Sequence, residues 1–560
     1  MSLSQFQTLP PHVVQMVVDY IPDRGHGFLY DEYDNSKENM ARHMALLWIS
    51  SNFRAIVQLR YCRALCLQLI DKTSVVESAQ ASWPFRPKEL GYPTHHFAKE
   101  LSLELSMPCI CSGQALKMLS HAPYNGCAFP LVRSITFNFI PPPWRRRNYI
   151  VASRLRTNAN FSAFVQWIKE MAPRLDKVNV AVHEYSPYRS QSTIQDFSSL
   201  VSQLFQLASR IEYNTHIETA PMELQLKAVR NLVHINCSCF DNSDEAVQLA
   251  RQSASTLQVL SIKMHLATDI PGLIHDGDGK YVEYPCLYTL KLECHRALRL
   301  SPRPVFGGAS FFPRLRRLNI KADYPFGDDT LFRGNAATLE YLNMAMDPEM
   351  VSMFKKYDVF TPTSHPNLQC VEVGDIQDLI STHFATSVEY TQFVLGIAPK
   401  LSVLTIYGVS ASLTFQPVLS LLGEHTSIRV LRLPLTSMCL WDALVLIKSL
   451  PLLTHLYTMS TSLGTMPAGM NLDMLPMYMC STYTSMCNRF RYWGFEYSQK
   501  DPSKDVVTCV LLLVLVCPSF DHSALEYRLH RSFMAQIKMA MAMRGYEHYS
   551  PRLHRSLYIK

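Results

Sequence analysis

Apolar residues recur along the chain in a short pattern, in which two alternating positions follow a third that stands three residues earlier. In the clearest copy, within residues 312–320, Leu315, Leu318 and Ile320 fit the spacing L-x-x-L-x-L. Residues 318 and 320 alternate like side chains on one face of a β-strand, and residue 315 falls in the turn before it. Further copies begin at Leu232, Leu257, Leu287, Leu339, Leu368, Leu401 and Ile428. One copy cannot bury its own apolar edge, so the pattern predicts strands stacked side by side.

The spacing between copies leaves room for a helix in each. From Leu232 on, the first positions are separated by 25, 30, 28, 24, 29, 33 and 27 residues. Weaker copies begin at Ala98, Val132, Leu175 and Leu453. Several copies follow an amphipathic run, such as the apolar positions Phe161, Phe164, Val165, Ile168 and Met171. Proline often stands just before the first leucine, where it would end the helix and extend the chain into the strand, at Pro173, Pro285, Pro313, Pro366 and Pro399.

A repeat of helix, turn and strand with this period is typical of leucine-rich repeats. The predicted fold class is therefore α/β, a leucine-rich-repeat-like solenoid with short parallel strands on the concave face and helices outside. Asn or Cys three residues beyond the last leucine is usual in that family, but His, Asp, Ile or Thr stands there in most copies. We therefore expect irregular coils without a continuous asparagine ladder.

Two apolar helical segments precede the repeats. The first begins at Leu9-Pro10 and carries Val13, Val14, Val17, Val18 and Ile21 on one face. The second, residues 44–57, includes Leu47, Trp48, Phe53, Ile56 and Val57. Together they resemble the F-box, which opens with Leu-Pro and an apolar helix and later has an apolar helix with an aromatic-Arg step, here Phe53-Arg54. The whole chain resembles a set of fungal F-box-like proteins with a leucine-rich-repeat body.

This resemblance implies a function. In that family the F-box helices dock on a Skp-type adaptor of a cullin-based (SCF-like) ubiquitin ligase, while the repeats hold a protein substrate. The adaptor-binding positions would be Leu9, Pro10, Val13, Val14, Val17, Ile21, Trp48 and Phe53. The alternative is that these helices only cap the first coil of a stand-alone interaction scaffold, since every solenoid needs a cap.

Two sets of polar residues are candidates for the substrate surface. Arg316, Arg317 and Asn319 lie between the apolar positions of the clearest copy, so they would face outward from its core. Trp144, Arg145 and Arg146 follow a run of prolines, where Arg could supply forked donors and Trp a stacking face. The simpler interpretation of this second set is a solvated loop, since charge runs are usually exposed.

Composition narrows the class of protein. Hydrophobic residues make up 48% and charged residues 18%, which favours core-forming chains. The net charge of +7 is a small excess over this length, so we expect neither nucleic acid nor a membrane as a partner. The fifteen cysteines show no C-x-x-C pair, and we expect buried free thiols rather than a metal site. Residues 1–8 lack a secretory signal, so we expect a cytoplasmic or nuclear protein.

The chain divides into three predicted parts. They are an F-box-like helical segment at 1–72, an irregular solenoid at 73–520, and a C-terminal capping helix with a basic tail at 521–560. The apolar run Val506–Cys517 is too short to span a bilayer, and we expect it to be a buried strand. No catalytic motif, phosphate-binding loop or cofactor motif is found, so the sequence predicts a recognition protein rather than an enzyme. A hydrolase hidden in the insertions between repeats would need clustered His, Asp and Ser.

Overall fold

A computed structural model describes part of the chain, chiefly the strands, the turns before them and several helices. The described residues are 64–69, 76–79, 98–119, 129–139, 154–182, 199–215, 231–238, 243–266, 273, 282–296, 311–322, 337–344, 365–373, 392, 395–406, 422, 427–462, 464–465, 478, 489–495, 509, 512–513 and 517. The chain forms two compact units. The first contains the described residues through His265, and the second contains those from 282 onward.

The strands of each unit follow one another in the sheet in chain order, except that β2 lies outside β1 at the edge. In the first unit the order is β2 (Val76–Ala79), β1 (Ala64–Leu69), β3 (Glu100–Leu105), β4 (Ser134–Phe139), β5 (Lys177–Val182), β6 (Arg210–Thr215), β7 (Leu232–Ser238) and β8 (Val259–Leu266). In the second it is β9 (Thr289–Arg296), β10 (Arg317–Ala322), β11 (Tyr341–Met344), β12 (Cys370–Val373), β13 (Val403–Ile406), β14 (Val430–Cys439), β15 (His455–Ser462) and β16 (Tyr492–Phe495).

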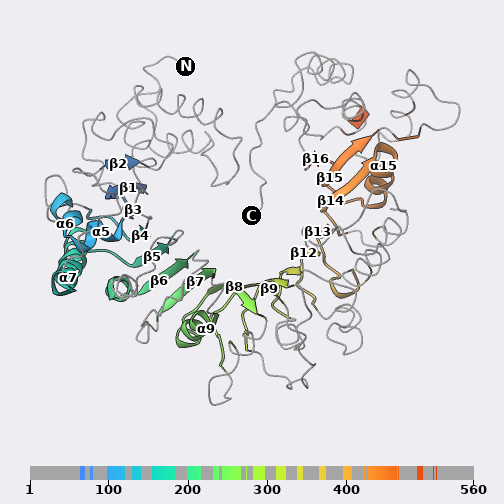
Figure 1. Ribbon diagram of the computed structural model, residues 1–560. Coiled ribbons are helices and arrows are strands. Elements are labelled where there is room, and N and C mark those ends of the chain that lie inside the picture. The colour runs from blue at the N-terminus through green and yellow to red at the C-terminus, as the bar shows by residue number, and fades with distance from the viewer. Residues whose placement is uncertain are drawn as a thin grey trace, which may run out of the picture. The chain divides into compact units, whose positions relative to one another are not determined.

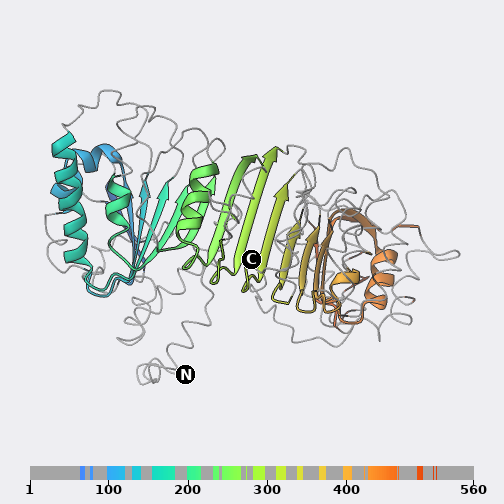
Figure 2. The same ribbon diagram turned by 90° about the horizontal axis from the view of Figure 1, so that it is seen from below.

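Neighbouring strands are parallel, apart from β2, which pairs with β1 in the antiparallel direction. Figure 2 shows the strands of each unit running side by side in one direction. Equivalent positions of successive copies stand opposite each other, so that Leu318 of β10 pairs in register with Leu290 of β9 and Leu342 of β11. Parallel strands require a crossover between them, which is where the intervening chain of each coil runs. The predicted α/β class and the repeated, solenoid-like parallel sheet are thereby confirmed.

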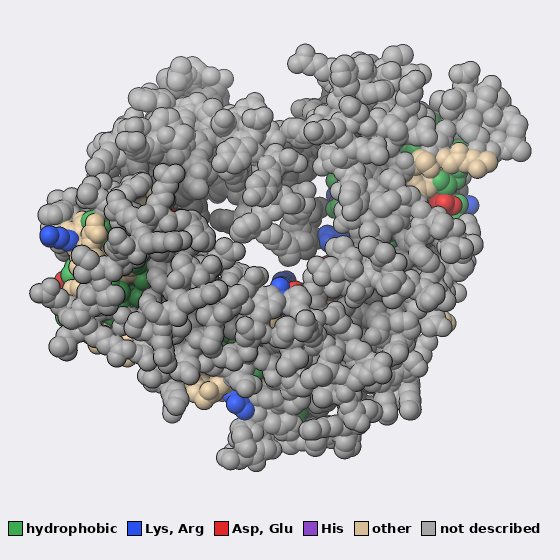
Figure 3. Space-filling model, in the orientation of Figure 1, with side chains coloured by type: hydrophobic (Ala, Val, Ile, Leu, Met, Phe, Trp, Pro, Cys, Tyr) green, Lys and Arg blue, Asp and Glu red, His purple; other side chains and the backbone are tan. Residues whose placement is uncertain are grey.

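Helices lie beside the strands. Their bounds are α5 (Met107–Cys111), α6 (Gln114–Leu119), α7 (Arg154–Met171), α9 (Ser243–Gln252) and α15 (Leu440–Ser449). Figure 1 shows α5 to α7 gathered beside the first strands and α15 beside β14. Gly113, at a φ of 75°, makes the turn between α5 and α6, where a Cβ atom would lie 3.0 Å from Asn160 Oδ1 of α7. In Figure 3, hydrophobic, acidic and basic side chains lie together over α15.

The core consists of the residues that the repeat pattern selects. Leu315 and Leu318 are fully buried and Ile320 is 1% exposed, whereas Arg316 and Arg317 between them are exposed. The first two apolar positions of the other copies are buried in the same way, apart from Leu175, which is partly exposed. Each such side chain contributes about 1.5 to 3 kcal/mol of burial. The strand register predicted from the sequence is therefore confirmed.

The prolines before the repeats have a more specific role than the one we expected. Pro313 is the second residue of a β-turn in which the Leu315 N–H donates to the Phe312 carbonyl at 3.1 Å. Proline suits this position because its fixed φ matches the turn. The same turn occurs around Pro173, Pro285, Pro366, Pro399 and Pro451. Proline thus sets the corner before the strand rather than extending the chain directly into it.

Hydroxyl groups tie adjacent coils together at this corner. In three copies the residue before the first apolar position is Ser or Thr, and its hydroxyl donates to the first-position carbonyl of the preceding coil. Thr338 Oγ1 donates to Leu315 O at 2.8 Å, Ser427 Oγ to Leu401 O at 2.8 Å and Thr256 Oγ1 to Leu232 O at 3.0 Å. We call these bonds the hydroxyl ladder. The hydroxyl ladder lies before the strand of a repeat, whereas the asparagine positions considered in the sequence lie after the strand. Polar residues therefore still link these coils, at the other end of the strand.

The structure also departs from the sequence-based expectations. The strands β1, β2, β6 and β16 were not expected, and β1 lies within the 1–72 segment that we expected to be helical. Within the run Val506–Cys517, the described residues Cys509, Leu512 and Leu513 are helical, so the predicted strand is wrong there. A short apolar run fits a buried helix as well as a buried strand, and periodicity alone does not separate the two.

Several predictions fall on other parts of the chain. The adaptor-binding positions from Leu9 to Phe53, the loop with Trp144, Arg145 and Arg146, and the C-terminal segment 521–560 lie outside the described residues. The three-part division of the chain likewise stays a prediction.

Candidate functional site

Polar and aromatic side chains of the second unit form two rows across its strands, on the face opposite the buried leucines. The first row is Thr289, Arg317, Tyr341, Cys370, Val403, Val430, His455 and Tyr492. The second row is Lys291, Asn319, Asn343, Glu372, Thr405, Arg432, Tyr457 and Gly494. Because side chains alternate along each strand, both rows face away from the leucine core. We call this surface the polar strand face.

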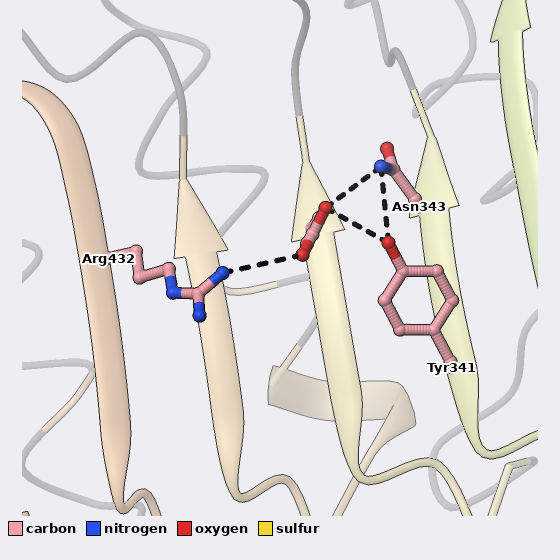
Figure 4. A network of polar contacts seen from close by, with 4 residues as sticks. Tyr341, Asn343 and Arg432 are labelled. Carbon is pink, nitrogen blue, oxygen red and sulfur yellow. Dashed lines mark hydrogen bonds and ion pairs between the residues drawn. The ribbon is translucent and has the colours of Figure 1, made fainter. Parts of the chain in front are cut away.

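Glu372 of β12 is the centre of the contacts on this face. Its Oε2 accepts hydrogen bonds from Tyr341 Oη at 3.0 Å and from Asn343 Nδ2 at 2.9 Å, both on β11. On its other side, Arg432 Nη1 of β14 lies 3.9 Å from Glu372 Oε1. Figure 4 shows the carboxylate between these groups. Hydrogen bonds to a charged acceptor are stronger than neutral ones, so this network fixes three side chains relative to one another.

The ion pair between Glu372 and Arg432 reaches across the strand that lies between theirs. β13 lies between β12 and β14, and its residue at the same level is Thr405. The Thr405 side chain is short, and the residue is 1% exposed, as expected when longer side chains meet above it. Its Oγ1 makes no hydrogen bond within the described part of the chain. A bulky residue at 405 would separate the two charged groups.

Arg432 also contacts an aromatic cluster on the last two strands. Its guanidinium lies over the Tyr457 ring, with 5.2 Å between the guanidinium carbon and the ring centroid. Tyr492 of β16 then contacts Tyr457 at 5.4 Å and His455 at 5.9 Å between ring centroids. Stacking on an aromatic face orients a guanidinium while leaving its N–H groups in the ring plane open to other acceptors. Arg432 is therefore held in place by Tyr457 on one strand and Glu372 on another.

Burial and the Glu372 charge together raise the pKa of two neighbouring groups. Burial is the larger cause in each case, and the carboxylate adds to it because a second negative charge nearby is unfavourable. The pKa of the Tyr341 phenol is raised well above its usual range. The pKa of the Cys370 thiol is raised to about 12. Both groups are therefore neutral at physiological pH, and Tyr341 acts as a hydrogen-bond donor.

The raised pKa of Cys370 predicts slow alkylation. At pH 8 a thiol with a pKa of about 12 is ionised to roughly one part in ten thousand, and the thiolate is the reactive form. We expect the rate of Cys370 labelling by iodoacetamide, followed by mass spectrometry of its peptide, to keep rising about tenfold per pH unit from 7 to 10. In the variant Glu372→Gln the rate at pH 8 should increase, because a negative charge is removed. A rate that levels off near pH 9 in the native protein would contradict the assigned cause.

The first unit has a smaller charged cluster on the equivalent face. Lys177 Nζ of β5 lies 2.7 Å from Glu212 Oε1 of β6, and His234 Nδ1 of β7 lies 3.9 Å from the same oxygen. Burial lowers the pKa of His234 and outweighs the opposite effect of Glu212. His234 is then largely neutral at pH 7, and Lys177 is the main counter-ion of Glu212.

The structure places three of the candidate substrate residues. Arg317 and Asn319 belong to the polar strand face, on the first and second rows. Arg316 lies just before β10 and is exposed, with its Nη1 3.8 Å from Glu340 Oε1. These three were chosen from one copy of the repeat. The residues that make the network, Tyr341, Glu372, Arg432 and Tyr457, occupy the equivalent polar positions of later copies, which is the signal that could have identified them.

The described residues contain neither a cluster of metal-binding side chains nor a helix that could cross a membrane. Groups of three or more His, Cys, Asp or Glu side chains able to hold a metal ion are absent from the described segments. Cys109 and Cys111 both lie on α5. α7 is the longest described helix at 18 residues, and none of the described helices is both long enough and apolar enough to cross a bilayer.

Comparison with family models and with curated proteins found no match to this chain.

Proposed function

We propose that this protein is a non-enzymatic substrate-recognition subunit of a cullin-type ubiquitin ligase. In this proposal the N-terminal helices bind a Skp-type adaptor, and the polar strand face receives a protein substrate. The cytoplasm or the nucleus is then the site of action, where such ligases and their substrates meet.

The observation that carries the proposal is the separation of roles along each strand. Leucines on one side make the core, while the other side bears Tyr341, Glu372, Arg432 and their neighbours without contributing to that core. A surface of this kind can vary without loss of the fold, which suits recognition of a specific partner. The F-box-like Leu9-Pro10 and the valines after it, ahead of such a body, support the ligase assignment.

The adaptor-binding part is tested by co-purification. We expect the full chain to capture a Skp-type adaptor, and the double variant Val14→Asp, Val17→Asp to lose that capture, because two charges would enter the apolar face of the first helix. The matched control is His12→Asp, Gln15→Asp, which places two carboxylates at the same spacing on the polar side of that helix and should retain capture.

Thermal unfolding of all three proteins shows whether the body is folded. Loss of capture in a folded Val14→Asp, Val17→Asp variant alone supports the docking role. Absence of capture by the folded wild-type chain would rule out the ligase proposal and leave the alternative, a stand-alone repeat scaffold whose N-terminal helices are a cap.

A further inference from the structure

Three basic side chains on the polar strand face have no hydrogen bond to any described residue. They are Lys291 of β9, Arg317 of β10 and Arg432 of β14. Arg317 is exposed, and the side chains of Lys291 and Arg432 are partly exposed, that of Arg432 by 32%. The distance of 3.9 Å between Arg432 and Glu372 is an ion pair but exceeds hydrogen-bond length. The N–H groups of the Arg432 guanidinium therefore make no hydrogen bond within the described part of the chain, and Glu372 faces only its Nη1.

Arg432 is also oriented before any partner arrives. Tyr457 lies against one face of the guanidinium and Glu372 stands at its edge. Glu372 in turn is fixed by Tyr341 and Asn343, whose donors occupy its Oε2. A guanidinium that is already oriented loses less rotational freedom when it binds a planar anion such as a carboxylate. The arrangement is suited to receive a carboxylate from outside the chain.

The spacing of the two arginines fits an extended peptide that crosses the strands. Arg317 and Arg432 are separated by four strand steps, through β11, β12 and β13, and by two residues along the strand direction. With strands about 4.8 Å apart, this places their backbones roughly 20 Å from each other. An extended chain advances about 3.3 Å per residue, so two carboxylates about six residues apart would reach both arginines.

The acidic residues on this face argue against nucleic acid as the partner. Glu372 lies between the two arginines, and Glu293 belongs to β9 beside Lys291. A continuous run of phosphates would place negative charges against them, whereas a peptide can present neutral residues there. Isolated carboxylates at a defined spacing match isolated cations at the same spacing.

We propose that the polar strand face of the second unit binds an extended acidic protein segment, with one carboxylate on Arg432 and a second, about six residues away, on Arg317. The inference rests on the proposed function, in which this face receives the substrate, and it names the chemical class of that substrate.

The test uses the full-length protein and fluorescein-labelled peptides of twelve residues, in a background of Gly, Ser and Ala. One peptide carries Glu at positions 3 and 9, another has Gln at both, and a third has Glu at positions 3 and 6. We expect fluorescence anisotropy to show binding of the first peptide, at least about tenfold weaker binding of the Gln peptide, and intermediate binding of the third, which reaches one arginine at a time.

The variants Arg432→Gln and Arg317→Gln should each weaken binding of the first peptide about tenfold or more. Arg429→Gln is the matched control, because Arg429 is an exposed arginine just before β14 that lies outside both rows, and it should bind as the wild type does. Arg317 is exposed and its side chain makes no hydrogen bond or ion pair with a described residue, so its variant tests the site even if the Arg432 change disturbs Tyr457.

Three results with the peptides would each overturn the inference. They are no binding of the first peptide up to about 1 mM, equal binding of the Glu and Gln peptides, or unchanged affinity in both the Arg317 and Arg432 variants. Tighter binding of a single-stranded oligonucleotide than of the first peptide would also overturn it. Adaptor capture is measured separately, so a protein that captures the adaptor but ignores acidic peptides contradicts this inference alone, and the reverse result contradicts the ligase proposal alone.

Discussion

Replacement of Leu318 by aspartate is expected to unfold the second unit near room temperature. Leu318 is fully buried, and it packs in register with Leu290 and Leu342 on the adjacent strands. The change removes a buried apolar side chain and leaves a carboxyl group without a hydrogen-bond partner in the core. We expect a loss of about 5 kcal/mol or more in the free energy of unfolding, comparable with the whole stability of a typical domain. Urea unfolding followed by circular dichroism measures it.

The matched control for this prediction is Asn319→Ala on the same strand. Asn319 lies on the polar strand face, and its Oδ1, though buried, makes no hydrogen bond with a described residue. Truncation there should change the free energy of unfolding by about 0.5 kcal/mol or less. If Leu318→Asp and Asn319→Ala destabilised the protein equally, the assignment of the two faces of β10 would be wrong.

The second large effect is expected from Trp493→Ala on the last described strand. Trp493 is 1% exposed, stands in register with Leu456, and donates its Nε1–H to Thr458 Oγ1 at 2.9 Å. Removal of so large a side chain from a packed core should cost about 3 to 5 kcal/mol. Thr458→Val tests the hydrogen bond separately, and we expect about 1 to 3 kcal/mol because the indole N–H would stay buried without this acceptor.

The control for Trp493 is its neighbour Tyr492, which lies on the opposite face of β16. Tyr492 is partly exposed, and it contacts the rings of His455 and Tyr457, which are themselves partly exposed. Tyr492→Ala should therefore cost less than half of what Trp493→Ala costs. A larger loss from Tyr492→Ala would mean that the polar strand face, and not the leucine side, carries the stability of these last coils.

The sequence pattern predicted most strands because leucine spacing alone decides which side chains can be buried together. Two of the strands that it missed, β1 and β16, obey the same spacing with other residues. β1 has Cys62, Leu65 and Leu67 at the three positions, and β16 has Phe490, Trp493 and Phe495. β6 lacks a leading leucine, and its buried residues are Ile211 and Tyr213. A search for apolar volume in place of leucine would have found these strands.

The candidate site was harder to predict because its contacts join residues on different coils. Glu372 meets Arg432 only because β13 places the short Thr405 between them, and it meets Tyr341 through the register of β11 with β12. The alternation of side chains predicted that Arg317 and Asn319 face away from the core, which the structure confirms. It could not predict which polar side chains would reach across an intervening strand, since that depends on side-chain length at three positions at once.

The hydroxyl ladder has a consequence for how such a chain can change over time. Each of its bonds joins a coil to the one before it and to no other, as in the contact of Thr338 with Leu315. The intervals between successive copies already differ by up to nine residues, from 24 to 33, without disturbing the register of the strands. Because the acceptor is a backbone carbonyl, which every coil offers, duplication of a coil that carries the hydroxyl would repeat the same junction. The body can lengthen by whole coils, while the residues that meet a partner are altered one strand at a time.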